Sequence, residues 1–387
     1  MLLYDELLIG ALSKVFKDRL EEFLNSLTSP GKRYYVRVNT LKTSPEHIVE
    51  SLRSRGVEIY RDEDLYEAIY FPIKGPYKVD PRDKVVVVDK YTAESVYIGS
   101  HLYGPGVITC SRDIERGDTV AIVSENSVVV GEGTAMMSCR EMLMKRKGVA
   151  VQVTASVYRV PSIRSFPEYE KGMIYPQSLA AMYVAHIVDP RPRELILDVC
   201  AAPGGKTSHI VELSRGRTHV IALDHSAKRL ENMRLEMDRL GCTPFIEIWR
   251  SDSRYVHVDF GGMKVDKIVV DPPCSALGVR PKIYDIKSYR DVVTAAKYQI
   301  QFLRSATKLL KRGGVVVYST CTVTLEENEE IIEKILSEDR CLEPVPIDVK
   351  RGSRGYRGSV YGDAFLRFYP HEHDTTGYFI AKLVKKC

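Results

Sequence analysis

Residues 198–206, with the sequence DVCAAPGGK, constrain the fold of this chain more than any other segment. The apolar residues 195–197 before them predict the end of a buried strand, and residues 207–214 after them predict a helix. A strand, a glycine turn and a helix N-terminus direct backbone N–H groups towards a ligand. The turn lacks both the spaced glycines of a dinucleotide site and the pattern of a phosphate loop. We therefore expect a smaller cofactor here; the alternative is a glycine-rich connection that binds nothing.

From residue 172 onward, the pattern alternates between strands and helices. This alternation predicts an α/β fold, a Rossmann-like doubly wound sheet with its ligands at the carboxyl ends of the strands. The expected strands are 195–199, 219–223, 245–249, 266–270, 314–318 and 378–384. The expected helices lie near 177–188, 206–214, 226–240, 293–311 and 325–337.

A chain of 387 residues is long enough for two or three domains. Residues 1–73 predict a small α/β unit, helical over its first 27 residues and then containing a strand and a capped helix. Residues 74–155 hold short β-rich runs separated by turn residues, which indicates an inserted β-barrel. Residues 156–387 then form the sheet domain, which contains the glycine turn.

The bulk composition favours a soluble globular protein, with 44% hydrophobic and 28% charged residues. The N-terminus does not resemble a secretory signal and no apolar run could span a bilayer, so we expect a cytoplasmic protein without a membrane partner. Eight cysteines are scattered along the chain without a C-x-x-C pair. We therefore expect neither a metal site nor a disulfide framework. A net charge of +5 permits an anionic partner without requiring one.

Three acidic residues follow successive predicted strands after the glycine turn, namely Asp224, Asp252 and Asp271. An acid at the end of the second strand can accept hydrogen bonds from ribose hydroxyls, which suits Asp224. Asp252 is placed for the amino group of an adenine. The alternative for each is an ordinary helix N-cap, worth about 1 kcal/mol.

Two cysteines also follow strand ends: Cys274 comes after the strand that ends at Asp271, and Cys321 comes after the next strand. An isolated cysteine is more often a buried apolar residue than a nucleophile, but two on neighbouring strand ends lie above one cleft. The reactive form is the thiolate, and a free thiol titrates near about 8.5. A helix predicted just after Cys321 favours its thiolate, although Glu326 and Glu327 in the first turn oppose this effect.

These motifs together resemble the Nol/Nop/Sun-domain family of RNA 5-methylcytosine methyltransferases, S-adenosylmethionine-dependent enzymes on a Rossmann-like fold. The matching segments are 198–207, 271–275 (DPPCS), 311–314 and 318–322 (YSTCT), and the resemblance extends over nearly the whole chain. Residues 37–42 (RVNTLK) look like the N-terminal RNA-binding signature of that family. The one departure is Asp-Pro-Pro in place of Asp-Ala-Pro, which keeps the carboxylate and the second proline.

The β-rich insert resembles a PUA domain, a small RNA-binding barrel, over residues 93–107 and the glycine-containing turns that follow. A PUA domain in this position is similar to the branch of the family that modifies the acceptor end of tRNA. The resemblance therefore implies a tRNA (cytosine-5)-methyltransferase, and we expect a monomer.

The resemblance also assigns roles to single residues. Cys321 would attack carbon 6 of the cytosine, Cys274 would resolve the covalent adduct, Asp271 would hold the base, and Lys206 would reach the base or its carbonyl oxygen. S-adenosylmethionine would lie over the glycine turn, with Asp224 and Arg229 at the ribose and Asp252 at adenine. The cofactor-binding set is Cys200, Ala201, Ala202, Pro203, Gly204, Gly205, Lys206, Asp224, Arg229, Asp252 and Asp271.

Basic residues supply candidate contacts to RNA phosphates. They are Arg280 and Lys282 beyond the active-site loop, residues 145–147 in the insert, and the basic, glycine-rich segment 350–357, which we expect to be a flexible loop. Alternative functions are the same reaction on ribosomal RNA, or a non-catalytic RNA-binding factor on a methyltransferase fold. A nicotinamide-dependent oxidoreductase is disfavoured because the spaced glycine fingerprint is absent.

Overall fold

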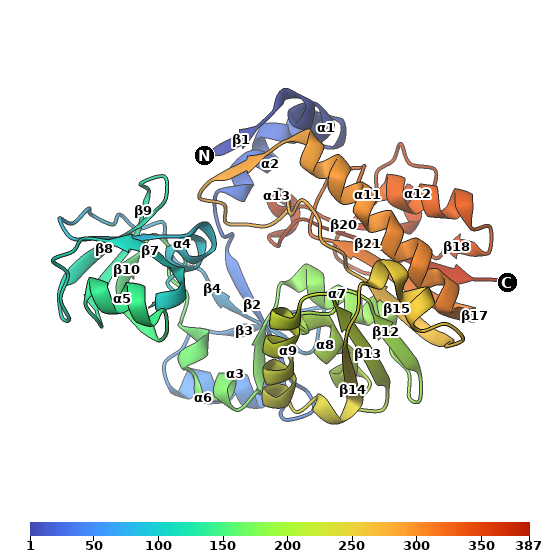
Figure 1. The fold of residues 1–387 in the computed structure, drawn as a ribbon, viewed down its shortest axis with the longest axis horizontal. Helices are drawn as coiled ribbons and strands as arrows, with labels where there is room; N and C mark the ends of the chain where they lie inside the picture. The colour runs from blue at the N-terminus through green and yellow to red at the C-terminus, as the bar shows by residue number, and fades with distance from the viewer.

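The structure is a computed structural model that describes residues 1–387, and its largest part is a nine-stranded sheet (Figure 1). The strand order is β14-β13-β12-β15-β17-β21-β20-β19, with β18 paired to β21. Strands β12 to β15 and β17 are parallel, and β21 is antiparallel to β17. The predicted doubly wound fold is confirmed.

Six of these strands were predicted, and their bounds agree with the prediction to within four residues, whereas β18, β19 and β20 were not predicted. The strands of this sheet are β12 (Leu195–Asp198), β13 (His219–Asp224), β14 (Ile246–Arg250), β15 (Val265–Val270), β17 (Leu310–Thr320), β18 (Leu342–Pro344), β19 (Ser353–Arg354), β20 (Leu366–Phe368) and β21 (Tyr378–Lys385).

Helices cover both faces of the sheet, and each face has its own apolar core. Helices α7 (Leu179–Val188), α8 (Gly205–Leu213) and α9 (Ala227–Leu240) pack on one face. Helices α10 (Val256–Asp259), α11 (Tyr289–Ala306) and α12 (Glu329–Glu338) pack on the other. Helix α12 begins four residues later than predicted, because Glu327 and Asn328 are buried and hydrogen-bonded in the loop before it.

The N-terminal unit (residues 1–73) contributes a second, four-stranded sheet in the order β11-β2-β4-β3. Its elements are β2 (Arg33–Val38), α3 (Pro45–Ser54), β3 (Tyr60–Arg61), β4 (Ala68–Pro72) and β11 (Ile174–Pro176). Ser44 caps α3 by accepting from the backbone N–H of His47, with Pro45 in the first turn. Strand β11 pairs with β2, so the segment after residue 156 adds a strand to this small sheet before it enters the large one.

The first 27 residues lie against the large sheet domain. Strand β1 (Leu2–Tyr4) pairs in parallel with β16 (Asp285–Lys287), and helices α1 (Glu6–Phe16) and α2 (Leu20–Leu27) follow. Their apolar faces pack on Leu277, Val292 and Val323 of the sheet domain. Figure 1 shows these helices beside α11 and α13 (Pro370–His373).

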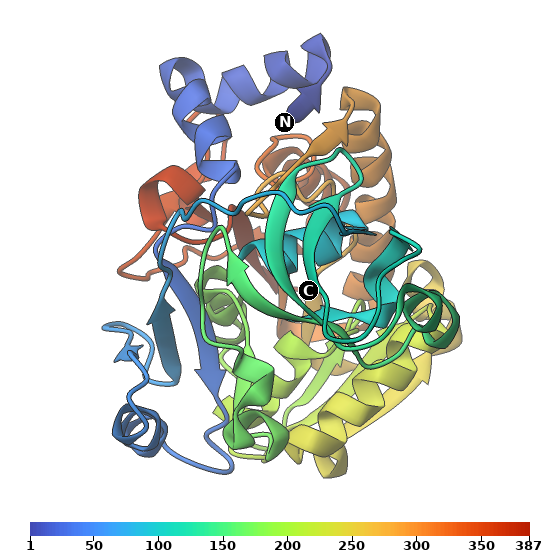
Figure 2. The ribbon, with the colours of Figure 1, turned by 90° about the vertical axis from the view of Figure 1, so that its left-hand side faces the viewer.

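The inserted β-rich domain forms a separate lobe with its own core (Figures 1 and 2). Its six strands run in the order β6-β10-β9-β8-β5-β7. The elements are β5 (Val85–Val88), α4 (Lys90–Tyr97), β6 (Leu102–Tyr103), β7 (Val107–Cys110), β8 (Thr119–Ser124), β9 (Val129–Ala135), α5 (Cys139–Lys145) and β10 (Val149–Ser156).

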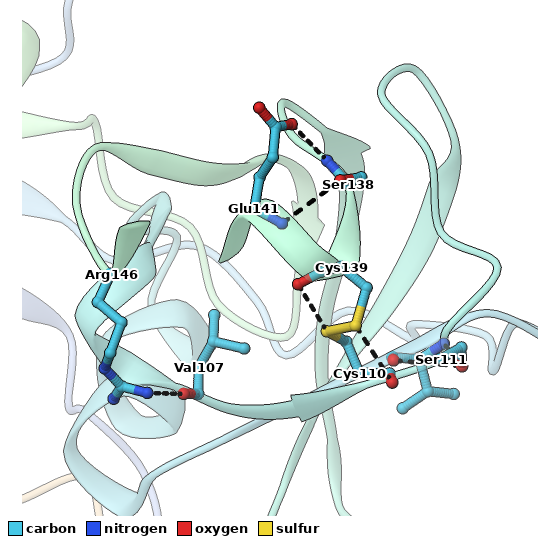
Figure 3. The surroundings of a disulfide bond; sticks show 8 residues. Val107, Cys110, Ser111, Ser138, Cys139, Glu141 and Arg146 are labelled. Carbon is cyan, nitrogen blue, oxygen red and sulfur yellow. Dashed lines mark hydrogen bonds between the residues drawn. A yellow bond between two sulfur atoms is a disulfide. The ribbon is translucent and has the colours of Figure 1, made fainter. Parts of the chain in front are cut away.

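Two disulfides correct the expectation that the cysteines are unpaired. Cys110 at the end of β7 is bonded to Cys139 at the start of α5 (Figure 3), and Cys341 is bonded to Cys387. The partners are 29 and 46 residues apart in sequence, yet their Cα atoms are only 5.8 and 5.2 Å apart. The tertiary fold brings the partners together, and their spacing in the sequence does not predict the pairing.

None of the helices is both long enough and apolar enough to cross a bilayer.

Candidate active site

The glycine turn leaves β12 and enters α8 as the sequence predicts. Gly204 has φ +105°, which L side chains rarely adopt, and a Cβ there would lie 2.5 Å from Met237 Cε. The buried Asp198 accepts from Thr207 Oγ1 at 2.7 Å and from the Cys200 N–H at 3.4 Å, and burial raises the pKa of Asp198 to about 6. Asp198 therefore fastens the turn to the first turn of α8, a role that the sequence analysis did not assign.

Asp224 and Asp252 both line one small pocket beside this turn. The Asp224 carboxylate is almost fully buried; it accepts from the Ser226 N–H at 2.9 Å and pairs with Arg229 Nη1 at 3.0 Å. Arg229 also donates to the carbonyl oxygen of Ala202 on the turn. Asp252 pairs with Arg254, whose hydrogen bonds hold the pKa of that carboxyl below its usual range.

The lining of this pocket suits a nucleoside. Carboxylates on two strand ends can accept from ribose hydroxyls and from an adenine amino group. The remaining wall is largely apolar or aromatic, with Cys200, Pro273, Tyr298 and Phe302 among its residues. Asp224, Arg229, Asp252 and Cys200 are thus brought together as predicted, and the residues present fit the adenosine half of S-adenosylmethionine.

Cys274 and Cys321 face each other with their sulfur atoms 3.3 Å apart. They follow β15 and β17, which are parallel neighbours, and the Gly278 N–H donates to the Cys321 carbonyl at 3.0 Å. A hydrogen bond from Cys274 lowers the pKa of the Cys321 thiol, and Lys206 acts in the same direction. That same hydrogen bond, together with burial, raises the pKa of Cys274. The pair therefore favours a thiolate on Cys321 and a neutral thiol on Cys274.

Asp271 and Lys206 complete the cluster around the two cysteines. Lys206 Nζ donates to Asp271 Oδ2 at 2.6 Å. Burial lowers the pKa of the Lys206 ammonium, but Asp271 and Tyr378 together more than offset this and hold that pKa well above its ordinary value. The other carboxylate oxygen, Oδ1, accepts from Ser319 Oγ at 2.7 Å and from the Tyr378 hydroxyl at 3.1 Å. The structure thus brings together all four predicted catalytic residues.

Glu327 does not lie in the first turn of a helix, where the sequence prediction wrongly placed it. Its expected effect holds, because its charge raises the pKa of the Cys321 thiol and so opposes the thiolate. Its carboxylate is instead buried before α12 and accepts from the Ser275 N–H at 2.8 Å and from Gln299 Nε2 at 2.9 Å. Burial raises the pKa of Glu327. Because Ser275 follows Cys274, this network holds the loop that carries the second thiol.

Two side chains of the RVNTLK segment, Arg37 and Asn39, are buried against the rest of the chain, whereas Lys42 is exposed. The Arg37 guanidinium is completely buried and donates to both oxygens of Glu212, each at 2.8 Å. It also donates to Ser208 Oγ and to the Gly205 carbonyl, each at 2.7 Å. Asn39 is equally buried and bonds to two backbone carbonyls. Arg37 thus docks the N-terminal unit onto α8, and Asn39 docks it onto Gly172 and the last residue of α9, Leu240.

A second cluster crosses the same interface. Glu67 accepts from His186 Nε2 at 2.6 Å and from His209 Nε2 at 2.9 Å. Burial lowers the pKa of His209 to about 3, so its imidazole is neutral. Glu67 lies in the N-terminal unit and the two histidines lie on α7 and α8, so this cluster too joins the unit to the sheet domain.

Some of the predicted phosphate contacts are buried ion pairs. Arg280 pairs with Asp374 at 2.9 Å and Lys282 pairs with Asp285 at 2.8 Å, and both basic side chains are only 5% exposed. Arg351, expected in a flexible loop, bonds to Asp62 of the N-terminal unit. Exposed basic side chains remain at 145–147 and at 350, 354 and 357.

Comparison with known proteins agrees with the class that the fold and site define, a Rossmann-like methyltransferase with an inserted RNA-binding domain. Residues 185–384 match the family 16S rRNA methyltransferase RsmB/F, and residues 84–157 match the PUA domain. The chain belongs to the RsmB/F methyltransferase family, as the Nol/Nop/Sun resemblance predicted.

Two similar proteins and one solved structure match most of the chain. A tRNA (cytosine(72)-C(5))-methyltransferase of Pyrococcus horikoshii is 40% identical over 95% of this chain and 93% of its own length. The human tRNA (cytosine(72)-C(5))-methyltransferase NSUN6 is 31% identical over 91% of this chain and 82% of its own length. The crystal structure of NSun6 from Pyrococcus horikoshii with SFG covers 99% of this chain and 98% of its own, with a TM-score of 0.88 and 38% identity.

Proposed function

We propose that this protein transfers a methyl group from S-adenosylmethionine to carbon 5 of a cytosine in tRNA, in the acceptor stem, through a covalent cysteine–cytosine intermediate. The observation that carries the proposal is the pair of sulfur atoms 3.3 Å apart beside the Lys206–Asp271 pair. The names of the similar proteins support a tRNA substrate. SFG, bound in the related crystal structure, is an analogue of S-adenosylmethionine, which supports the cofactor.

Carbon 5 of cytosine is a weak nucleophile, and the proposed chemistry overcomes this with a thiolate. The Cys321 sulfur adds to carbon 6, which makes carbon 5 electron-rich, as in other cases of covalent catalysis. S-adenosylmethionine supplies an electrophilic methyl group when bound. Loss of the proton from carbon 5 and cleavage of the bond between Cys321 and carbon 6 then restore the ring, and Cys274 acts at this resolving step.

Asp271 and Lys206 stabilise the charge that develops on the ring during this reaction. The Asp271 carboxylate accepts from the amino group of the base, and the Lys206 ammonium lies beside it as a hydrogen-bond donor. The target base must leave its stack to reach the two thiols at the strand ends. Exposing a cytosine at the end of a stem costs less free energy than exposing one inside the stem.

The test uses three cysteine variants with tRNA, S-adenosylmethionine and bisulfite sequencing as the readout. We expect Cys321→Ala to abolish methylation, and Cys274→Ala to accumulate a protein–RNA adduct that survives a denaturing gel. Cys242→Ala is the matched control, because Cys242 is a free cysteine buried at the end of α9, outside the catalytic cluster. Full turnover by Cys321→Ala would overturn the covalent mechanism.

The same assay separates the competing functions. Methylation of ribosomal RNA but not tRNA would move the substrate to the alternative that the family description suggests. RNA binding by the wild-type protein without any methyl transfer would indicate a non-catalytic binding factor.

A further inference from the structure

The Asp271 carboxylate is held by donors from three separate elements. Lys206 reaches it from α8, Ser319 from the end of β17 and Tyr378 from the start of β21. Strands β17 and β21 are hydrogen-bonded neighbours, with Thr320 opposite Phe379. Ser319 is completely buried and Tyr378 is 4% exposed. The sheet therefore fixes both hydroxyl donors independently of any bound base.

The Asp271 carboxylate has one acceptor position left for substrate. Each carboxylate oxygen can accept about two hydrogen bonds. Ser319 and Tyr378 together saturate Oδ1, whereas Oδ2 accepts from Lys206 alone. The only vacant acceptor position thus lies on Oδ2, beside the Lys206 ammonium.

We propose that Tyr378 is a positioning residue for methyl transfer, because its hydroxyl, together with that of Ser319, fixes Asp271 with Oδ2 turned towards the amino group of the target cytosine. This inference rests on the proposed function. Tyr378 acts through Asp271 and is not itself assigned a contact with the base.

The surroundings of Tyr378 suit it to this task. Burial raises the pKa of its phenol, so the hydroxyl keeps its proton and stays a donor throughout the neutral range. The Lys206 ammonium lies 5.7 Å from the centre of its ring, so the ring also borders the second catalytic donor. Replacing tyrosine by phenylalanine keeps this ring and removes only the oxygen.

The test compares Tyr378→Phe with wild type and with Tyr183→Phe as the matched control. Tyr183 is 3% exposed, lies in the same apolar core, and has a hydroxyl without a partner. We expect Tyr378→Phe to lower kcat about tenfold or more, the size expected for losing one hydrogen bond to a charged group. The KM for tRNA should change less than about twofold, because tRNA binding is spread over many phosphate contacts.

A second measurement detects coupling between the hydroxyl and the cytosine amino group. The target cytosine is replaced by pyrimidin-2-one, which lacks only that amino group, and single-turnover adduct formation is measured with both proteins. The two bases and two proteins form a double-mutant cycle, in which the difference in intrinsic reactivity between the bases is the same for both proteins and cancels. We expect the amino group to accelerate the wild type at least threefold more than Tyr378→Phe.

Two outcomes would overturn the inference: equal amino-group effects in the two proteins, or the same fall in kcat in Tyr183→Phe. Ser319→Ala provides an independent check, since it removes the second donor to the same oxygen and should also reduce the amino-group effect. An inactive wild-type protein would count against the proposed function itself, so the two failures are distinguishable.

Discussion

Replacing Arg37 by methionine should expose how strongly the N-terminal unit is fastened to the sheet domain. The guanidinium makes a bidentate pair with Glu212 and bonds to Ser208, Gln177 and the Gly205 carbonyl. Methionine keeps most of the side-chain length but leaves the Glu212 carboxylate, 1% exposed, without a countercharge. Breaking one side of a buried ion pair costs about 3–5 kcal/mol.

The pH dependence of this loss has a definite sign. Burial raises the pKa of Glu212 to about 7 even with Arg37 present, well above the ordinary value of a glutamate carboxyl. A carboxyl with a raised folded-state pKa favours folding below its unfolded pKa, and this contribution is lost as pH rises through the folded value. In Arg37→Met the lone carboxyl takes up a proton at pH 5, so the destabilisation should be larger at pH 8 than at pH 5.

Denaturant unfolding of the full chain provides the assay. Trp249, the only tryptophan, lies on β14 and reports on the large sheet. The exposed pair between Arg61 and Glu46 supplies the control, and Arg61→Met should cost less than about 1 kcal/mol. The double variant of Arg37 and Glu212, both to methionine, should lose less stability than the two single variants together. A cost below about 1 kcal/mol for Arg37→Met, or full additivity in the double variant, would refute the reasoning.

Two further predictions concern the cysteines. In Cys274→Ala the pKa of Cys321 should rise because its hydrogen-bond donor is gone. The rate of Cys321 alkylation by iodoacetamide, followed by mass spectrometry as a function of pH, should therefore shift about 1 pH unit higher. An unchanged pH curve would contradict the assignment of the thiolate to Cys321. Replacing Cys341 and Cys387 by serine opens a bond between residues 46 apart and should lower the free energy of unfolding by about 4 kcal/mol on the loop-entropy model. Unfolding with and without a reductant checks this, and a loss below about 1 kcal/mol would count against a bond that constrains the unfolded chain.

The catalytic cluster could be predicted from sequence because parallel strands impose a simple geometry. Asp271 and Cys274 follow β15, Cys321 follows β17, and both strands end at the same edge of the sheet. Lys206 begins the helix after the neighbouring strand β12. Strand order and direction therefore bring these residues together before any side-chain packing is known.

The supporting residues could not be found in this way, because their contacts depend on distant packing. Tyr378 reaches Asp271 only because β21 folds back antiparallel to β17, 107 residues after Asp271 in sequence. The sequence placed Glu327 in the first turn of a helix, but the structure buries it in the loop before α12. Arg37 carries no local sign that its partner lies on α8, 175 residues away. Each of these contacts is a product of the tertiary fold.

The first turn of α8 links the interface of the N-terminal unit to the catalytic centre. Arg37 binds the Gly205 carbonyl, and the next residue, Lys206, binds Asp271. The guanidinium thus holds the backbone from which the catalytic ammonium extends, and Asp198 fixes the same turn through Thr207. Removing residues 1–73 would leave Glu212 without its countercharge and would free this turn on one side. The N-terminal unit is therefore part of the structure that positions Lys206, whatever it contributes to RNA binding.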